Sequence, residues 1–267
     1  MDLFESKMIN LLCDLKENYH VCSIKSEFET EGATLEEVMY LKNLVSSLGL
    51  DLTLKIGGAE AIRDIRDAKN LEVNAIVAPM IETPYALHKF SSGINKIFSE
   101  EEQKNIKFLI NIETKSGFDN SEEILSSDDA QIISGIVLGR TDLTGSLGLM
   151  QDCVDNKEVF EYAQMLALKS AKYGKEFIIG GGVTSNSLLF FKRLPFVSKI
   201  ETQKVIFNSD ILNLNEPEKA LIKAFEFELL WIKNKQNLFG SLTNEDIKRI
   251  KLLESRYNAS VPKTAVL

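Results

Sequence analysis

The chain has 267 residues, of which 44% are hydrophobic and 26% charged, and these globular values exclude the disordered and fibrous classes. Its net charge of −8, without any basic stripe, argues against a nucleic-acid groove or an anionic membrane surface as partner. No apolar run reaches the roughly 20 residues of a membrane span, and the N-terminus lacks a signal-peptide layout, so we expect a soluble cytoplasmic protein.

Apolar runs and amphipathic segments alternate along the whole chain. Amphipathic helices are predicted at 2–18, 34–48, 59–68, from 84 onward, 121–127, 157–172, 216–236 and 243–256. Strands are predicted at 21–28, 52–57, 74–80, 108–113, 135–139, 176–182, 197–202 and 204–207. Two helix starts carry capping signals, a capping box at Thr34 with Glu37 and an N-cap at Thr83 before Pro84.

Regular alternation of strand and helix predicts parallel pairing, in a closed barrel or an open doubly wound sheet, and the number of strands favours a (β/α)8 TIM-type barrel. The eighth strand follows the seventh too closely for a full crossover. It either completes the barrel from an unusual direction or continues the seventh strand. We expect the barrel with its N-terminal helix at 1–212, C-terminal helices at 213–258 and a loose tail at 259–267.

Alternate residues of a strand share a face, and the apolar alternates of each strand are assigned to the outer helices. The inward residues are then polar: Lys25, Glu27, Lys55, Asn111, Glu113 and Glu201, joined at a neighbouring strand end by Asp142. So many charges around one cavity require mutual pairing or a bound cation. A purely structural ion-pair network is the alternative, but the position at strand C-termini favours an active site.

Hard divalent cations prefer carboxylate oxygens, so Glu113 and Asp142 are candidate ligands for Mg²⁺ or Mn²⁺, which would act as a Lewis acid on a 2-keto acid. A zinc-type site is not expected, because the three cysteines form no C-x-x-C pair and the sequence has only two histidines. The run Gly180–Gly182 permits either a close approach of backbone amides to an anion or a tight strand exit.

Three motifs carry a resemblance to a known family: Ala-Pro-Met-Ile-Glu-Thr at 78–83, Asn-Ile-Glu-Thr at 111–114, and Gly-Arg-Thr-Asp-Leu-Thr-Gly-Ser-Leu-Gly at 139–148. In this order and spacing they resemble the HpcH/HpaI aldolase and citrate lyase β-subunit family, over most of residues 20–208. The resemblance implies a pyruvate-kinase-like barrel, a homo-oligomer, and Mg²⁺ or a similar ion held by Glu113 and Asp142. It further implies that amides around Thr141–Thr144, Leu143 included, bind the carboxylate of a keto acid.

The sequence departs from the family pattern at two places. Lys55 stands where the family offers an arginine to the substrate, and lysine keeps the charge but not the bidentate fork. Arg140, beside the metal motif, could compensate. The strand mouth at Lys25–Glu29 lacks the histidine of the family's base, and Glu27 could replace it if burial raises its pKa toward neutrality.

These observations predict a metal-dependent, aldol-type carbon–carbon lyase that acts on a 2-keto acid through a pyruvate-like enolate. Glu27, Lys55 and Arg140 are the candidate catalytic residues. Substrate binding is assigned to Lys25, Lys55, Thr141, Asp142 and Leu143. The alternatives are a CoA-thioester lyase or a phosphoenolpyruvate-type enzyme on the same barrel, or an inactive barrel whose C-terminal helices dock a partner.

Overall fold

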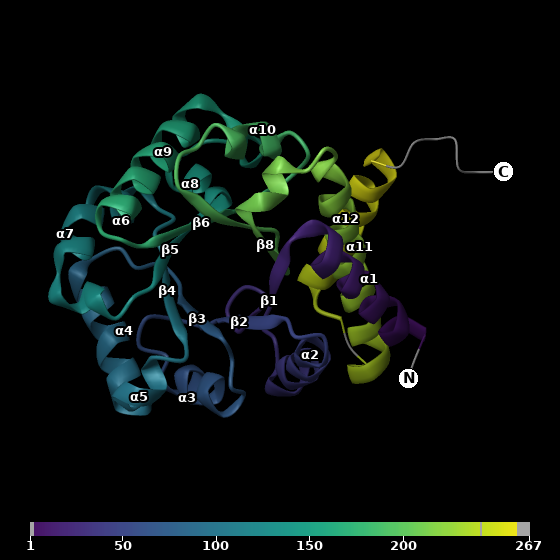
Figure 1. Ribbon diagram of the computed structural model, residues 1–267, viewed down its shortest axis with the longest axis horizontal. Coiled ribbons are helices and arrows are strands. Elements are labelled where there is room, and N and C mark those ends of the chain that lie inside the picture. Colours follow the sequence, from purple (N-terminus) through teal and green to yellow (C-terminus); the bar gives the residue numbers. More distant parts are fainter. Residues whose placement is uncertain (1–2, 241, 261–267) are drawn as a thin grey trace.

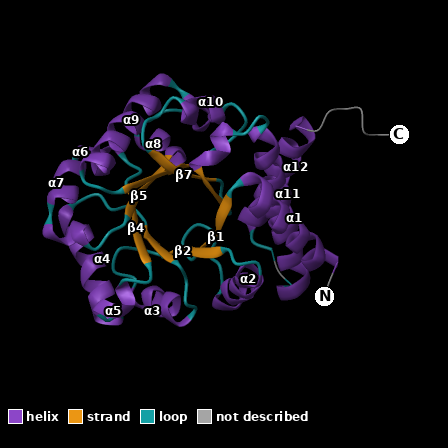
Figure 2. Ribbon diagram, viewed as in Figure 1, coloured by secondary structure: helices purple, strands orange, loops and turns teal. Residues whose placement is uncertain are grey.

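The computed structural model describes residues 3–240 and 242–260, which form a closed eight-stranded barrel with helices around it (Figure 1). The strands follow one another around the barrel in chain order, and the helices lie outside them (Figure 2). The predicted fold class is confirmed. The strands are β1 (Val21–Glu27), β2 (Asp51–Lys55), β3 (Ala75–Ala78), β4 (Lys107–Asn111), β5 (Gly135–Gly139), β6 (Glu176–Gly180), β7 (Val197–Glu201) and β8 (Val205–Asn208).

One helix precedes the barrel, two follow it, and the others lie between strands. The helices that precede or connect the strands are α1 (Leu3–Tyr19), α2 (Leu35–Ser47), α3 (Ile62–Asn70), α4 (Pro84–Ile97), α5 (Glu100–Gln103), α6 (Lys115–Asp119), α7 (Ser121–Ser126), α8 (Arg140–Ser146), α9 (Lys157–Lys172) and α10 (Ser187–Lys192). Helices α11 (Pro217–Phe239) and α12 (Asn244–Ser260) follow the last strand. Short 3₁₀ helices are η1 (Asp128–Gln131), η2 (Gln151–Asp155) and η3 (Ser209–Asn213).

The local signals at helix starts act as predicted in two helices. Thr34 and Glu37 form the complete capping box of α2, and Thr83 accepts a hydrogen bond from Ala86 N at the start of α4, with Pro84 in the first turn. Helix α3 begins later than predicted, at Ile62 instead of residue 59. A turn at 58–61, closed by a hydrogen bond from Ala61 N to Gly58 O (3.2 Å), occupies the difference.

Strand β8 completes the barrel from the opposite direction. Neighbouring strands from β1 to β7 are parallel, whereas β8 is antiparallel to both β7 and β1. A hairpin at 202–204 joins β7 to β8: Thr202 N donates to Val205 O (2.9 Å), and Val205 N donates to Thr202 Oγ1 (3.0 Å). Two antiparallel strands need only such a short connection, so the close spacing of the last two predicted strands is explained.

The reversed β8 determines where the C-terminal helices lie. The strand returns to the start of β1, where Asn208 N donates to His20 O (2.9 Å). From there α11 packs along α1, and it ends at Gly240 in the left-handed conformation (φ 74°). Helix α12 then packs on α11 beside the barrel (Figure 1).

The core has two parts that follow the alternation of the strands. The larger part fills the space between strands and outer helices and includes the outward residues Ile24, Leu52 and Ile110. A small apolar layer inside the barrel consists of Ala75, Val77, Leu109, Val137 and Ile178. The lumen is therefore filled by apolar side chains at one level and by the polar residues of the strand C-termini above it.

Within residues 3–240 and 242–260, no helix is long and apolar enough to cross a membrane. The three cysteines are free thiols and are partly buried. Most of the predicted tail at 259–267 lies outside the described residues, since α12 extends to Ser260 and 261–267 are not described. The domain limits, the cytoplasmic location and the homo-oligomer stay predictions.

The hairpin that reverses the chain depends on the hydroxyl group of Thr202, which is buried. We expect Thr202→Val to lower the free energy of unfolding by about 1–2 kcal/mol, because Val205 N loses its buried acceptor. Thr202→Ser keeps the hydroxyl and should lose less than half of that. Urea unfolding measures both, and equal losses in the two variants would contradict the assignment.

Candidate active site

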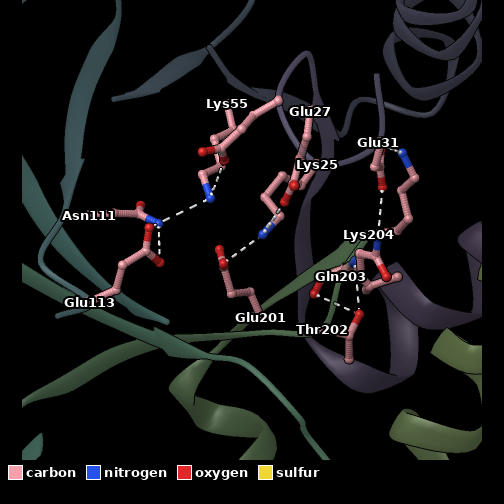
Figure 3. A network of polar contacts seen from close by, with 12 residues as sticks. Lys25, Glu27, Glu31, Lys55, Asn111, Glu113, Glu201, Thr202, Gln203 and Lys204 are labelled. Carbon is pink, nitrogen blue, oxygen red and sulfur yellow. Dashed lines mark hydrogen bonds and ion pairs between the residues drawn. The ribbon is translucent and has the colours of Figure 1, made fainter. Parts of the chain in front are cut away.

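A pocket of about 590 Å³ opens at the C-terminal ends of the parallel strands. Its floor is formed by six side chains of the upper lumen: Lys25, Glu27, Lys55, Asn111, Glu113 and Glu201. They come from β1, β2, β4, β7 and the residues just after β4, and all six are buried (Figure 3). The alternation of the strands therefore predicted the inward residues correctly.

Lys25 is held between two carboxylates, as Figure 3 shows. Its Nζ lies 2.7 Å from Glu201 Oε1 and 3.0 Å from Glu27 Oε1. Burial alone would lower the pKa of Lys25, but the adjacent Glu201 and Glu27 carboxylates outweigh it and hold that pKa above its ordinary value. Lys25 is therefore a fixed cation that ties β1 to β7.

Glu27 was predicted to act as a general base on the condition that burial raises its pKa toward neutrality, and this condition is not met. Burial does act to raise the pKa of Glu27, but the positive charges of Lys25 and then Lys55 outweigh it, so the pKa lies below its ordinary value. A carboxylate with a lowered pKa is a weak proton acceptor near neutral pH. Glu27 instead serves to neutralise Lys25.

Lys55 lies at the centre of the floor between two further carboxylates. Its Nζ is 2.7 Å from Glu29 Oε2 and 3.7 Å from Glu113 Oε1. Burial acts to lower the pKa of Lys55, and Glu113 with Glu27 and Glu29 raises it, with a net increase. Lys55 is thus a permanent cation beside Glu113. It lines the pocket, as its predicted role in substrate binding requires.

Glu113 is the floor residue whose charge is least well compensated. Its Oε2 accepts a hydrogen bond from Asn111 Nδ2 (2.7 Å). Burial raises the pKa of Glu113 to about 7, the negative charge of Asp142 adds to the increase, and Lys55 opposes it. Gly139 leaves room for this carboxylate, since a Cβ at that position would overlap Glu113 Oε2.

The first turn of α8 places Thr141 and Asp142 at the rim of the same pocket, with Asp142 exposed. Gly181, at φ 81°, lies so close to this turn that a Cβ would be 2.6 Å from Arg140 N. Gly180–Gly182 is thus the tight strand exit that one of the two interpretations predicted. The side chain of Leu143 is buried in the outer core and does not line the pocket, and the predicted contact of its backbone amide with substrate stays a prediction.

Arg140 does not face the substrate pocket, which corrects its predicted catalytic role. Its side chain is fully buried, and the guanidinium lies over the rings of Phe190 and Phe191, at 5.0 Å and 4.5 Å from their centroids. The guanidinium pairs with Asp155 and donates to Gly180 O (3.0 Å) and Gly181 O (2.8 Å). Because α8 starts directly at Arg140, the side chain follows the helix and turns toward α10 and η2 instead of the lumen.

The pocket residues fit a divalent cation held by two carboxylates. Around the floor, the carboxylates of Glu27, Glu29, Glu113, Asp142 and Glu201 face the ammonium groups of Lys25 and Lys55, so negative charge is in excess. Asn111 Oδ1 is buried and accepts no hydrogen bond from the residues that the structure describes, so it could accept one from water on a cation held by Glu113. Among the described residues, no group of three or more His, Cys, Asp or Glu side chains is arranged so that it could hold a metal ion together.

The residues of α12 that line the pocket were not predicted from the sequence. These residues, which we call the α12 wall, are Glu245, Lys248, Arg249 and Leu252. Nothing in the spacing of these residues distinguishes them from an ordinary polar helix face. They reach the pocket only because the reversed β8 brings α11 and α12 to the barrel mouth.

The fold is a TIM-type barrel, and its acidic pocket opens at the C-terminal ends of the strands, where such barrels carry their active sites. Within that class, the chain belongs to the HpcH/HpaI aldolase/citrate lyase family, whose model matches residues 45–179 and so includes Lys55, Glu113 and Asp142. Comparison with curated protein sequences gave no match.

Solved structures share the fold at low sequence identity. An HpcH/HpaI aldolase/citrate lyase family protein from Burkholderia cenocepacia J2315 has a TM-score of 0.58 at 14% identity, covering 85% of this chain and 92% of that one. The citrate synthase SbnG has a TM-score of 0.57 at 15% identity, covering 75% of this chain and 82% of that one.

The raised pKa of Glu113 predicts a pH-dependent cost to folding. The unfolded chain releases this proton near pH 4.5 and the folded chain near pH 7, so the folded state loses stability as the pH rises between these values. The measured quantity is the free energy of unfolding of Glu113→Gln minus that of the unmodified protein, both in EDTA. We expect this difference to be about 2–3 kcal/mol larger at pH 8 than at pH 4.5.

Denaturant unfolding at the two pH values measures this difference. Glu201→Gln is the contrasting variant, because it removes a partner of Lys25 and should be destabilising at both pH values. A Glu113→Gln difference that is the same at pH 4.5 and pH 8 would show that Glu113 titrates normally.

Proposed function

We propose that this protein is a divalent-metal-dependent lyase of aldol type, which makes or breaks a carbon–carbon bond next to the keto group of a 2-keto acid by way of a pyruvate-like enolate. The observation that best supports this proposal is that Glu113 and Asp142, at neighbouring strand ends, line one pocket beside the buried cation Lys55. Membership in a family of aldolases and lyases supports this reading.

Glu113 and Asp142 would hold Mg²⁺ or Mn²⁺, which suits an all-oxygen ligand set that leaves positions for substrate. When bound, such an ion supplies a Lewis acid that stabilises negative charge on a keto oxygen. Its positive charge also compensates the excess of carboxylates around the floor. The carboxylate of Glu113 is preorganised for this role by Asn111 and by the space at Gly139.

Lys55 is the floor residue best placed to attract the negative charge of a keto acid. It is a single ammonium group, so it orients an anion less strictly than the two-pronged guanidinium of arginine would. Thr141 and the backbone amides at the start of α8 supply donors at the rim, in the space left by Gly181. Lys25 is already paired with Glu27 and Glu201, and its proposed part is to keep that side of the floor neutral.

Deuterium exchange of the pyruvate methyl protons, followed by NMR in D₂O with Mg²⁺ or Mn²⁺, tests the function without knowledge of the second substrate. We expect exchange that requires the metal and falls at least about 100-fold in Glu113→Gln and Asp142→Asn, because loss of a positioned charge at such a site costs several kcal/mol.

Asp152→Asn is the matched control, since Asp152 is a second acidic residue that lines the pocket but is not a proposed ligand. It should retain exchange within about threefold. If metal binds and pyruvate does not exchange, the proposal in its pyruvate form is wrong, and a thioester or phosphoenolpyruvate substrate follows. Absence of both metal binding and exchange supports an inactive barrel.

A further inference from the structure

Helix α8 carries the proposed metal ligand Asp142, but the helix by itself does not fix its own first turn. It has only seven residues, and its N-cap, Gly139, has no side chain to accept a hydrogen bond from the first amides. Isolated helices this short are unstable in water, so tertiary contacts must set the position of α8. Burial of Leu143 and Thr144 anchors the middle of the helix, and the side chain of Arg140 anchors its first turn.

Arg140 joins this first turn to the end of β6. The parallel ladder between β5 and β6 ends at the pair Gly139 and Gly180. Just beyond that pair, Arg140 Nε donates to Gly180 O (3.0 Å) and Arg140 Nη2 donates to Gly181 O (2.8 Å). Gly181 is so close to α8 that a Cβ on it would be 2.7 Å from Thr141 N. The guanidinium therefore continues the connection between the two segments where the backbone ladder stops.

The same guanidinium also joins η2 and α10. Arg140 Nη1 pairs with Asp155 and donates to Val154 O (3.5 Å), both in η2, and Nη2 donates to Ser187 Oγ (3.3 Å) at the start of α10. Ser187 Oγ in turn donates to Asp155 Oδ2 (2.9 Å), so the Asp155 carboxylate is held from two sides. Every nitrogen of the guanidinium thus has an acceptor within the protein, and the fully buried side chain is not available to a substrate.

The segments that Arg140 joins form one side of the pocket. Asp142 of α8, Asp152 of η2 and Gly181 after β6 all line it. A buried charge is costly unless it is paired and fully hydrogen-bonded, and here Asp155 and the backbone carbonyls supply both conditions. An arginine suits this place because its planar fork can donate in several fixed directions at once, which the single ammonium group of a lysine cannot do.

We propose that Arg140 is a positioning residue: together with Asp155 it holds the first turn of α8 against Gly180 and Gly181, and so places the carboxylate of Asp142 for the metal ion. This inference rests on the proposed function, because it takes Asp142 as a ligand. Groups that orient a ligand without touching the ion contribute strongly to metal affinity, since the site must be held in its binding geometry before the ion arrives.

Calorimetric titration with Mn²⁺ tests the positioning role in Arg140→Lys. This variant keeps a positive charge for Asp155, but one nitrogen cannot also reach Gly180 O and Gly181 O. We expect the Mn²⁺ affinity to fall about tenfold. Val45→Ala is the control for a general loss of stability, because Val45 is buried in the outer core on α2, on the other side of the barrel from α10 (Figure 2). It should leave the affinity unchanged.

Unchanged affinity in Arg140→Lys, or an equal fall in Arg140→Lys and Val45→Ala, would overturn the inference. If Arg140→Lys does not fold, Ser187→Ala decides, because it keeps the arginine and removes only the hydroxyl that contacts Arg140 and Asp155. We expect Ser187→Ala to lower the Mn²⁺ affinity about threefold, and an unchanged value there would count against Arg140.

Hydrogen exchange in the metal-free protein gives a readout that needs neither metal nor substrate. In Arg140→Lys the amides of 140–145 and 181–183 should exchange about tenfold faster, because two hydrogen bonds of about 1 kcal/mol each are lost, while the amides of β4 should not change. Equal exchange in the variant and the unmodified protein would show that Arg140 does not fix this turn. If the unmodified protein binds no Mn²⁺, the proposed function fails, and the exchange rates alone decide whether Arg140 positions α8.

Discussion

The structure depends on the pairing of charges buried at the C-terminal end of the lumen. Each buried ion costs several kcal/mol unless an opposite charge lies close to it, so the strands must meet in a register that brings the ions together. Lys25 satisfies this by binding Glu201 on β7 and Glu27 on its own strand. Since β8 separates β1 from β7 in the barrel, this ion pair spans the point where the barrel closes.

The antiparallel β8 links that closure to the C-terminal helices. The hairpin at 202–204 lies at the barrel mouth, where Lys204 O accepts from Lys25 N (2.7 Å) and the Lys204 side chain pairs with Glu31. Lys204 N in turn bonds to Glu228 of α11, the partner of Arg249 on α12. A continuous set of polar contacts therefore connects the floor of the pocket to the α12 wall.

The sequence was sufficient for the barrel and for the inward residues of the floor, because both follow from short-range periodicity. It was not sufficient where the direction or the pKa of a side chain depends on residues that are distant in the sequence. Arg140 comes after the strand ends, so alternation no longer specifies its direction. The pKa of Glu27 depends on Lys25 being 3.0 Å away. The α12 wall depends on the reversal of β8, for which the sequence left two alternatives open.

The floor of the pocket and the wall that α12 contributes to it are held by different combinations of interactions. The floor is fixed by barrel strands with apolar cores on both sides. Helix α12 is held by two ion pairs to α11, Arg249 with Glu228 and Lys235 with Asp246, and by Leu253, which is fully buried in the outer core. The position of the α12 wall therefore depends on α11 and, through the hydrogen bond from Lys204 N to Glu228, on the hairpin between β7 and β8.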